Sequence, residues 1–511
     1  MAPNRFKEAL LRRDQFIYTV ELVPGRGARG KAQEDVLAFA EKAARGGLVH
    51  ALSVTDNPGG HPALAPEVIG IEIRRMGLDP IIHFTCKDKN RNQIESTLHA
   101  FDRMDIHNLL AMTGDFPLDG FEGNAKPVFD IDSVQLLHLI NKMNEGLEIS
   151  GRTPGKSTRL DPTHTFKGCA VSPFKKLESE TIAQYFKLWK KVRAGADFVI
   201  TQVGFDARKF DELLRYMRYC DMRVPVLGNV YILNFPVART MNRKSIPGCV
   251  VTDDLYRICE EESRFPDKGK AARLERAAKQ IALLRGIGYD GVHIGGLNLK
   301  YEDVEWVIGK STELFDNWTS FIQQFDYPQP GGFYLYEKDP ETGLNSDTFS
   351  CETNSPDKST GHALMRFFHR AVFTPGTPLY KIARSFFQAV EGTVFERPFT
   401  EMEHIIKYFS SRCRRCGDCT LDEIAFLCPQ SQCAKYLFNG PCGGSVEGWC
   451  EVFPDKRRCI FVRAYDRLKP YNEETSLKGG YICPRNWALD QTSSWTNYFL
   501  GRDHRAEARD S

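Results

Sequence analysis

The sequence has little of the features that would place it among charged or membrane-bound proteins. Lysine plus arginine number 68 and aspartate plus glutamate 66, so the formal net charge is only +2, which gives no reason to expect nucleic acid or an anionic membrane as partner. No apolar run approaches the roughly 20 residues that span a bilayer, and the polar, basic segment 1–14 lacks the apolar centre of a secretory signal. Internal repeats and low-complexity tracts are also lacking. These absences predict a soluble, cytoplasmic protein with no membrane span.

Cysteine divides the chain into unlike parts. The 511 residues and their 42% hydrophobic share suffice for two or three folded domains. Of the 15 cysteines, six are scattered over the first 412 residues and nine lie between 413 and 483. Scattered cysteines in a reducing compartment are mostly buried thiols, whereas the dense group has the spacing of metal ligands. We predict a first domain at 1–325, a Pro- and Gly-rich connector at 326–362, and a helical, cysteine-rich metal-binding domain at 363–511.

Short apolar runs alternate with helical patterns throughout the first domain. Eight runs have the length of buried strands, and each is followed by a connection long enough for a helix. They cover residues 16–22, 50–55, 80–85, 108–112, 165–171, 197–201, 224–230 and 291–294. Eight units without a long interruption favour closure of the sheet. The predicted fold is therefore α/β, a (β/α)8 TIM barrel followed by a smaller cysteine-rich domain.

Polar residues stand at or just after the carboxyl ends of these runs. In a barrel those ends meet at one rim, where the active site is built. A carboxylate such as Glu21, within an apolar strand, is either half-exposed at the rim or desolvated with a raised pKa, and the second state suits a general acid. We expect one site to contain several of these residues: Glu21, Thr55, His83, Thr85, Asp115, Gln202, Asn229 and His293.

A glycine-rich turn near the start of the chain supports a second interpretation, a dinucleotide-binding enzyme. Gly25, Gly27 and Gly30 follow a strand and precede a helix, and Asp56 ends the next strand, which matches the dinucleotide-binding fingerprint. The alternative is therefore an NAD-dependent dehydrogenase that uses Gly25–Gly30. A structural interpretation of the same residues, without a bound nucleotide, is a flexible glycine-rich loop at the rim.

Five ordered segments of the barrel region resemble the methylenetetrahydrofolate reductase family, which consists of flavin-dependent (β/α)8 barrels. The resemblance covers about residues 6–300, and its segments are 20–24 (VELVP), 54–55 (VT), 83–91 (HFTC with a following NR), 108–117 (NLLAMTGDFP) and 194–206 (AGADFVITQ with a following FD).

The resemblance implies a reaction and a role for each matching residue. Glu21 would be the general acid, Asp115 would lie beside both flavin and pterin, and Gln202 would bind the pterin. Thr55, His83 and Lys191 would bind the flavin, which is FAD or, alternatively, FMN. The enzyme would interconvert 5,10-methylenetetrahydrofolate and 5-methyltetrahydrofolate, with electrons from NAD(P)H or a redox partner protein and with a homo-oligomer as the expected assembly. A non-catalytic electron-transfer or scaffold subunit stays as a further alternative.

The cysteine spacing of the last domain predicts metal sites. A C-x2-C-x2-C run suits an iron–sulfur cluster and paired C-x2-C units suit zinc, so both metals stay open, with iron favoured. Two four-thiolate sites would use eight of the nine cysteines: Cys413, Cys416, Cys419, Cys428, Cys433, Cys442, Cys450 and Cys459. The segment 365–470, and its Asn-Gly-Pro-Cys-Gly-Gly sequence in particular, is similar to a domain that forms the partner subunit of acetogen reductases. That similarity implies an electron relay to the barrel or a docking role.

Overall fold

Eight parallel strands close into a barrel, as the sequence predicted. The computed structural model describes residues 3–150, 156–350 and 356–505. Around the barrel the strand order is β1-β10-β9-β8-β7-β4-β3-β2. The strands are β1 (Ile17–Leu22), β2 (Ala51–Val54), β3 (Asp79–Thr85), β4 (Asn108–Met112), β7 (Phe166–Val171), β8 (Phe198–Thr201), β9 (Val226–Tyr231) and β10 (Gly291–Gly295).

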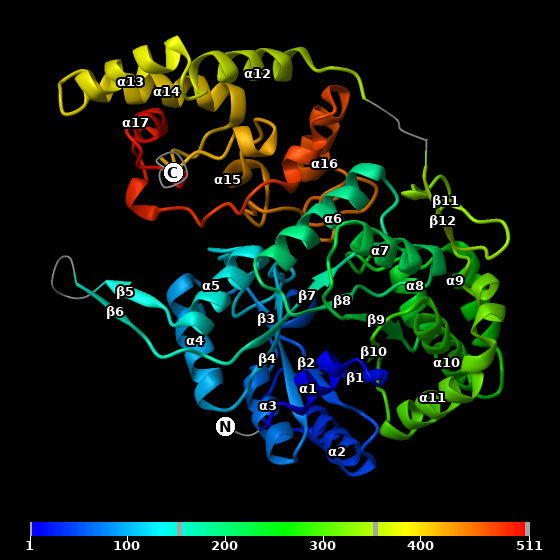
Figure 1. Cartoon of the computed structure of the whole chain (residues 1–511). Coiled ribbons are helices and arrows are strands. Elements are labelled where there is room, and N and C mark those ends of the chain that lie inside the picture. Colours follow the sequence, from blue (N-terminus) through cyan, green and yellow to red (C-terminus); the bar gives the residue numbers. More distant parts are fainter. Residues whose placement is uncertain (1–2, 151–155, 351–355, 506–511) are drawn as a thin grey trace.

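Helices cover the outside of the barrel (Figure 1). The main ones are α2 (Lys31–Gly46), α3 (Pro66–Arg75), α4 (Arg91–Arg103), α5 (Ser133–Glu145), α6 (Glu178–Arg193), α7 (Ala207–Tyr219), α10 (Lys270–Ile287) and α11 (Tyr301–Leu314). The last barrel crossover also contains α8 (Phe235–Asn242) and α9 (Asp253–Glu262), and a hairpin of β5 (Glu148–Ser150) and β6 (Ser157–Arg159) extends from the crossover between α5 and β7.

One end of the barrel is closed by the N-terminal helix α1 (Arg5–Arg12). Its Phe6 and Leu10 are fully buried and belong to the same apolar cluster as Phe166 and Phe198, whose rings meet Phe6 at 6.0 and 5.5 Å between centroids. The segment that the sequence showed only as polar and basic is therefore an amphipathic plug. It leaves the carboxyl end of the strands as the open end of the barrel.

The predicted connector at 326–362 contains structure. A hairpin of β11 (Tyr336–Lys338) and β12 (Asn345–Phe349) packs on α7. The Asn345 side chain donates to the Arg208 carbonyl at 2.8 Å and to Asp211 at 2.8 Å, and the Leu335 amide donates to Glu212 at 2.6 Å. This part of the connector is thus attached to the barrel, while residues 351–355 lie outside the described ranges.

The C-terminal module lies over the open end of the barrel (Figure 1). Its outer layer holds α12 (Thr360–Val372), α13 (Pro378–Val390) and α14 (Glu396–Ser411), the helical part of the predicted domain. Below them, cysteine-containing loops surround α15 (Pro429–Gln432), α16 (Ile460–Leu468) and α17 (Ser494–Phe499). Within the described residues, no helix is both long and apolar enough to cross a membrane.

Helix α6 joins the two parts. It packs against α16, and its polar residues Gln184, Lys187, Lys190 and Lys191 are buried. Lys187 Nζ donates to the carbonyls of Gly440 and Pro441 at 3.2 and 3.0 Å. A buried ammonium group is tolerated only where such acceptors replace its water. The module therefore completes the solvation that an isolated barrel would obtain from water.

We predict that Lys187→Ala weakens the junction. The substitution leaves the buried Gly440 and Pro441 carbonyls without their charged donor, which costs about 2–4 kcal/mol of unfolding free energy. Urea-induced unfolding followed by circular dichroism measures it. The control is Lys142→Ala on α5, because the Lys142 side chain is 53% exposed and pairs only with Glu145, a contact worth under about 0.5 kcal/mol. Equal destabilisation by both substitutions would contradict the assigned role of Lys187.

Candidate active site

A cavity of about 300 Å³ lies at the carboxyl end of the barrel strands, beneath the module. All six residues that the sequence assigned to catalysis or cofactor and substrate binding line it, together with the three other predicted strand-end residues. They are Glu21, Thr55, His83, Thr85, Asp115, Lys191, Gln202, Asn229 and His293. The structure therefore brings these predicted side chains to one cavity.

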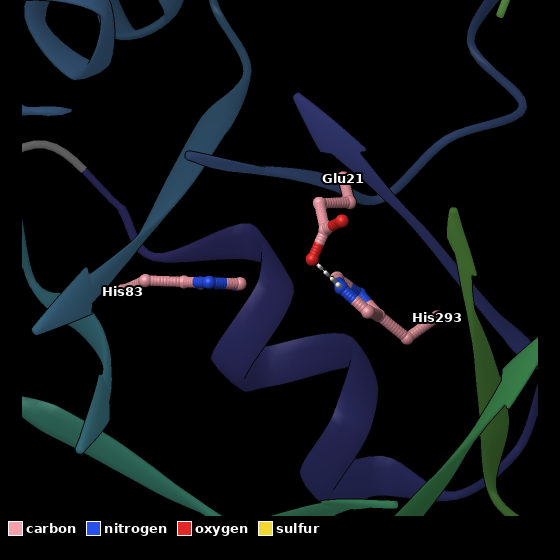
Figure 2. Close-up of side chains that lie close together, drawn as sticks. All are labelled: Glu21, His83 and His293. Carbon is pink, nitrogen blue, oxygen red and sulfur yellow. Dashed lines mark ion pairs between the residues drawn. The ribbon is translucent and has the colours of Figure 1, made fainter. Parts of the chain in front are cut away.

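Glu21 lies between two histidines, as Figure 2 shows. Its Oε2 is 3.8 Å from Nε2 of His293, and one carboxylate oxygen and one nitrogen from each ring all lie within 4.8 Å of one another. Burial raises the pKa of Glu21, but its interactions with His293 and His83 outweigh burial, so the pKa is lowered overall. Of the two states expected for Glu21, half-exposed at the rim or desolvated with a raised pKa, the structure shows the first, with the side chain 26% exposed. Burial also lowers the pKa of His83 to about 4, which keeps that ring neutral.

Several buried polar atoms around the cavity have no hydrogen-bond partner among the described residues. They are Thr55 Oγ1, His83 Nε2, Ser172 Oγ, Gln184 Nε2 and Asn229 Oδ1. Buried polar groups are nearly always paired, because an unpaired one costs about 1–3 kcal/mol. Their concentration around one cavity indicates a polar ligand with several donors and acceptors. Ser172 and Gln184 were not predicted, since they become neighbours of the site only when α6 packs beside β7.

The strand exit at Gly114 presents Asp115 as predicted. Gly114 has φ +87°, and a Cβ there would meet Thr85 Cβ at 2.9 Å, so a side chain is strained on both counts. Asp115 is exposed and accepts from the Gly59 amide at 2.8 Å. Gln202 directs Oε1 to the Val203 amide at 2.8 Å, and Lys191 donates to the Ala170 carbonyl at 2.5 Å. Burial lowers the pKa of Lys191 to about 8.

The module supplies one wall of the cavity, which sequence reasoning missed. The lining includes Lys435, Cys442, Gly443, Gly444 and Glu451. Lys435 is buried, forms an ion pair with Glu451 and donates to the Gly114 carbonyl at 2.7 Å, beside Asp115. On the barrel side, Lys175 donates to the Ser445 carbonyl at 2.7 Å. No local sequence pattern indicates that these residues reach the rim, because that contact depends entirely on docking.

The glycine-rich loop lacks the structural setting of a dinucleotide-binding turn. That fingerprint belongs to an open doubly wound sheet, whereas this sheet is a closed barrel. The amide and carbonyl of Gly25 are both bonded by the side chain of Gln33, at 3.0 Å each. The turn therefore folds onto α2, and the dehydrogenase alternative loses its structural basis.

The cysteines of the module fall into two groups. Cys413, Cys416, Cys419 and Cys428 line one cavity, which we call the outer cysteine cavity. There the buried Lys407 donates to Cys419 Sγ at 3.3 Å, and the Arg415 amide donates to Cys413 Sγ at 3.3 Å. Donors of this kind stabilise thiolates.

The other group, the inner cysteines, consists of Cys433, Cys442, Cys450 and Cys459. Three of them pack against one apolar cluster of the module, and Cys433 and Cys450 are close enough to interact electrostatically. Backbone amides reach the sulfurs of Cys433, Cys442 and Cys459. Because Cys442 also lines the rim cavity, the inner group adjoins the candidate active site.

Comparison with known proteins agrees with this arrangement. The family model described as methylenetetrahydrofolate reductase matches residues 6–308, which is more than half of the chain. The chain belongs to the methylenetetrahydrofolate reductase family. A second model, described as the methylene-tetrahydrofolate reductase C terminal, matches residues 393–488, which include both cysteine groups.

Individual relatives are distant. A "Probable methylenetetrahydrofolate reductase (NADPH)" of Caenorhabditis elegans is 24% identical over 54% of this chain and 39% of its own length. "Methylenetetrahydrofolate reductase 2" of Saccharomyces cerevisiae is 24% identical over 35% of this chain and 28% of its own. The chain thus spans less than half the length of these curated relatives. Among solved structures, an "Uncharacterized protein from Clostridium thermocellum" that "binds two copies of 5-methyl-5,6,7,8-tetrahydrofolic acid" aligns with a TM-score of 0.41 at 12% identity, covering 61% of this chain and 99% of that one.

We predict that the neutral, buried His83 makes stability depend on pH. Unfolded histidine titrates near 6.5 and folded His83 at about 4, so the unfolded chain binds more protons between these values. The contribution is complete above pH 6.5 and is lost as the pH falls toward 4, by about 3 kcal/mol. Urea unfolding at pH 4.5 and 7 should show a smaller pH effect for His83→Asn than for the unchanged chain. The same substitution at the exposed His61 should leave the pH effect as it is, and an unaltered effect in His83→Asn would contradict the prediction.

Proposed function

We propose that the protein is a flavin-dependent methylenetetrahydrofolate reductase that interconverts 5,10-methylenetetrahydrofolate and 5-methyltetrahydrofolate. The observation that carries the proposal is the rim cavity, in which every residue matching the family's functional positions comes together beside five unpaired buried polar atoms. Family membership supports the same activity. A scaffold without a reaction would have no use for so many unsatisfied polar groups, which cost stability.

The residues divide the chemistry among them. Ring opening of the methylene folate needs a proton at nitrogen, and Glu21 is the acid at the centre of the cavity. Gln202 and Asp115 bind and orient the pterin. A bound reduced flavin supplies the hydride.

The polar groups that line the cavity match the hydrogen-bonding groups of a flavin. Thr55 Oγ1 and His83 Nε2 offer unpaired partners for ring atoms, and Ser172 Oγ and Gln184 Nε2, with Lys191 nearby, offer a site for phosphate. An ideal Cβ on Gly443 of the module would lie 3.7–3.9 Å from atoms of Ser172 and Gln184. Farther along α6, Lys187 already donates to the carbonyls of Gly440 and Pro441. The module thus lies against this part of α6, and we propose FAD as the flavin, with FMN as the alternative.

The module's cysteines supply the route for electrons. We propose that the outer and inner groups each hold a metal centre and that iron–sulfur clusters relay electrons to the flavin. Cys442 on the cavity wall makes the inner group the immediate donor.

We predict that Glu21→Gln keeps its flavin but loses folate turnover by about 100-fold or more, because the amide cannot deliver the proton.

Asp115→Ala and Gln202→Ala should weaken folate binding, measured by folate titration against the flavin spectrum. Chromatography of the flavin released on denaturation shows whether it is FAD or FMN.

The matched control is Asp119→Ala. Asp119 lies four residues beyond Asp115, is half exposed, pairs with Arg26 and does not line the cavity. Its substitution should leave turnover and folate binding unchanged. Near-normal turnover in Glu21→Gln would disprove the assignment of the acid.

We also predict that Cys416→Ser with Cys428→Ser removes about half of the iron and sulfide, since one of two four-cysteine sites is lost. Electron transfer from the physiological donor to the flavin should then fail, while an artificial donor that reduces the flavin directly should still support turnover. Metal analysis and absorbance spectra of anaerobically purified protein measure the first effect.

A matched control uses Cys259→Ser. Cys259 is buried in the barrel-side cluster around Leu255 and Val251, away from both cysteine groups, so metal content should not change. Zinc in place of iron, or joint loss of both activities, would show a structural module, and full metal content in the double variant would refute the ligand assignment.

A further inference from the structure

The candidate acid presents a conflict that the structure itself resolves. A general acid must hold a proton at the working pH, yet the surroundings of Glu21 favour its ionised form. An ionised carboxylate cannot protonate the folate nitrogen. The proton must therefore be stored on a neighbouring group that can pass it to Glu21.

His293 on β10 is the neighbour placed to do so. Its side chain is 1% exposed, and Nε2 faces Glu21 Oε2 at 3.8 Å. Catalytic hydrogen bonds are often this long before substrate binds and shorten in the complex. The only other partner of Nε2 within the described residues is the Ser53 hydroxyl at 3.3 Å, which can donate to a neutral ring or accept from a protonated one.

The opposite side of the ring fixes which nitrogen is free. Thr19 Oγ1 lies 2.8 Å from His293 Nδ1 and donates to the Val292 carbonyl at 3.2 Å. A hydroxyl has one hydrogen, so when Thr19 donates to the Val292 carbonyl it accepts from the ring, and Nδ1 then carries the hydrogen. The tautomer is assigned by this network. Any further proton on the ring is therefore held at Nε2, which faces Glu21.

We propose that His293 is a positioning residue that shares one proton with Glu21, so that the Glu21–His293 pair, and not Glu21 alone, is the acid at neutral pH. The inference rests on the proposed function and adds to it. At rest the proton is on Nε2 and the carboxylate is ionised. As Glu21 protonates the folate nitrogen, Nε2 gives its proton to Glu21, and the ring becomes neutral. When product leaves, a proton from solvent restores the pair, so protons balance over a turnover.

Other titratable groups face the pair from the elements around it. They are His83 on β3, Asp56 after β2, Asp115 after β4, Tyr231 on β9 and Cys249 in the loop after α8. His83 stays neutral, with a pKa of about 4. Burial raises the pKa of Tyr231 to about 12 and that of Cys249 to about 12, so both keep their protons in the neutral range. Because interacting groups titrate as a unit, the basic limb of a pH–rate profile reports the pair.

The first test compares pH–rate profiles of folate turnover. In His293→Gln the side chain can still hydrogen-bond but stores no acid proton. The basic limb should move to lower pH by at least about one unit, so that activity falls about tenfold or more at pH 7.5 and much less at pH 5.5. Ser53→Ala, which removes only the hydroxyl near Nε2, should leave the limb in place. A uniform loss at all pH values, or an unmoved limb, would overturn the proposal.

The second test needs no turnover and uses the full chain without folate. In protein labelled with ¹⁵N-histidine, NMR should show His293 protonated on both nitrogens at pH 7 and on one nitrogen in Glu21→Gln. The signal is identified by its loss in His293→Gln or, if that variant does not fold, by its shift in Ser53→Ala. A singly protonated His293 in the unchanged protein would overturn the proposal. If NMR gives the expected result but the protein has no folate activity, the proposed function fails and the proton-sharing pair stands.

Discussion

The architecture depends on buried charged side chains at the junction of the barrel rim and one loop of the cysteine module. Side chains of each part form hydrogen bonds with backbone groups of the other. Asp132 caps α5 with one carboxylate oxygen and, with the other, accepts from the amides of Phe438 and Asn439 at 3.2 and 2.8 Å. Lys187 and Lys175 donate to carbonyls of the following residues. In the reverse direction, Lys435 of the module donates to Gly114 on the rim. Each partner loses its water only because the other replaces it.

This exchange explains the character of the cavity. The module contributes a cation, a carboxylate and two glycines to a site whose opposite side consists of strand ends. Gly444 must be glycine, because a Cβ there would overlap the Glu451 carboxylate. The lining is thus crowded on the module side and carries unpaired polar atoms on the barrel side. A ligand that fits must match the barrel by hydrogen bonding and the module by shape.

The sequence could predict the features that are encoded locally. Strands β4 and β10 agree with prediction to within one residue, because apolar runs are short, bounded and followed by polar ends. Because the carboxyl ends of all strands in a closed barrel lie on one rim, the sequence also predicted that Glu21 and His293 are on the same rim, although 272 positions separate them. The two cysteine groups were expected from spacing, but their membership needed the fold, since Cys428 joins Cys413 only when the loops close.

Other features have no local signal. Lysines on α6 look like a solvated face in the sequence, and only docking of the module buries them. Lys435 and Glu451 belong to irregular loops, and their pairing over the rim depends on contacts with Gly114, more than 300 positions away. The direction of the Glu21 pKa shift could not be predicted for the same reason: the apolar strand indicated burial, but the counteracting His293 comes from the last strand of the barrel.

The wall contributed by the module also sets an order of events during biosynthesis. The barrel strands are complete by residue 295, whereas the loop that covers them begins near residue 435. A nascent chain therefore exposes the whole barrel mouth before the covering loop has left the ribosome. Once the loop is in place, the exposed lining residues are on the barrel, among them Val23 after β1 and Asp115 after β4. A cofactor can thus meet the mouth uncovered on a nascent chain, whereas on the finished chain the exposed residues of the lining follow β1, β4 and β9.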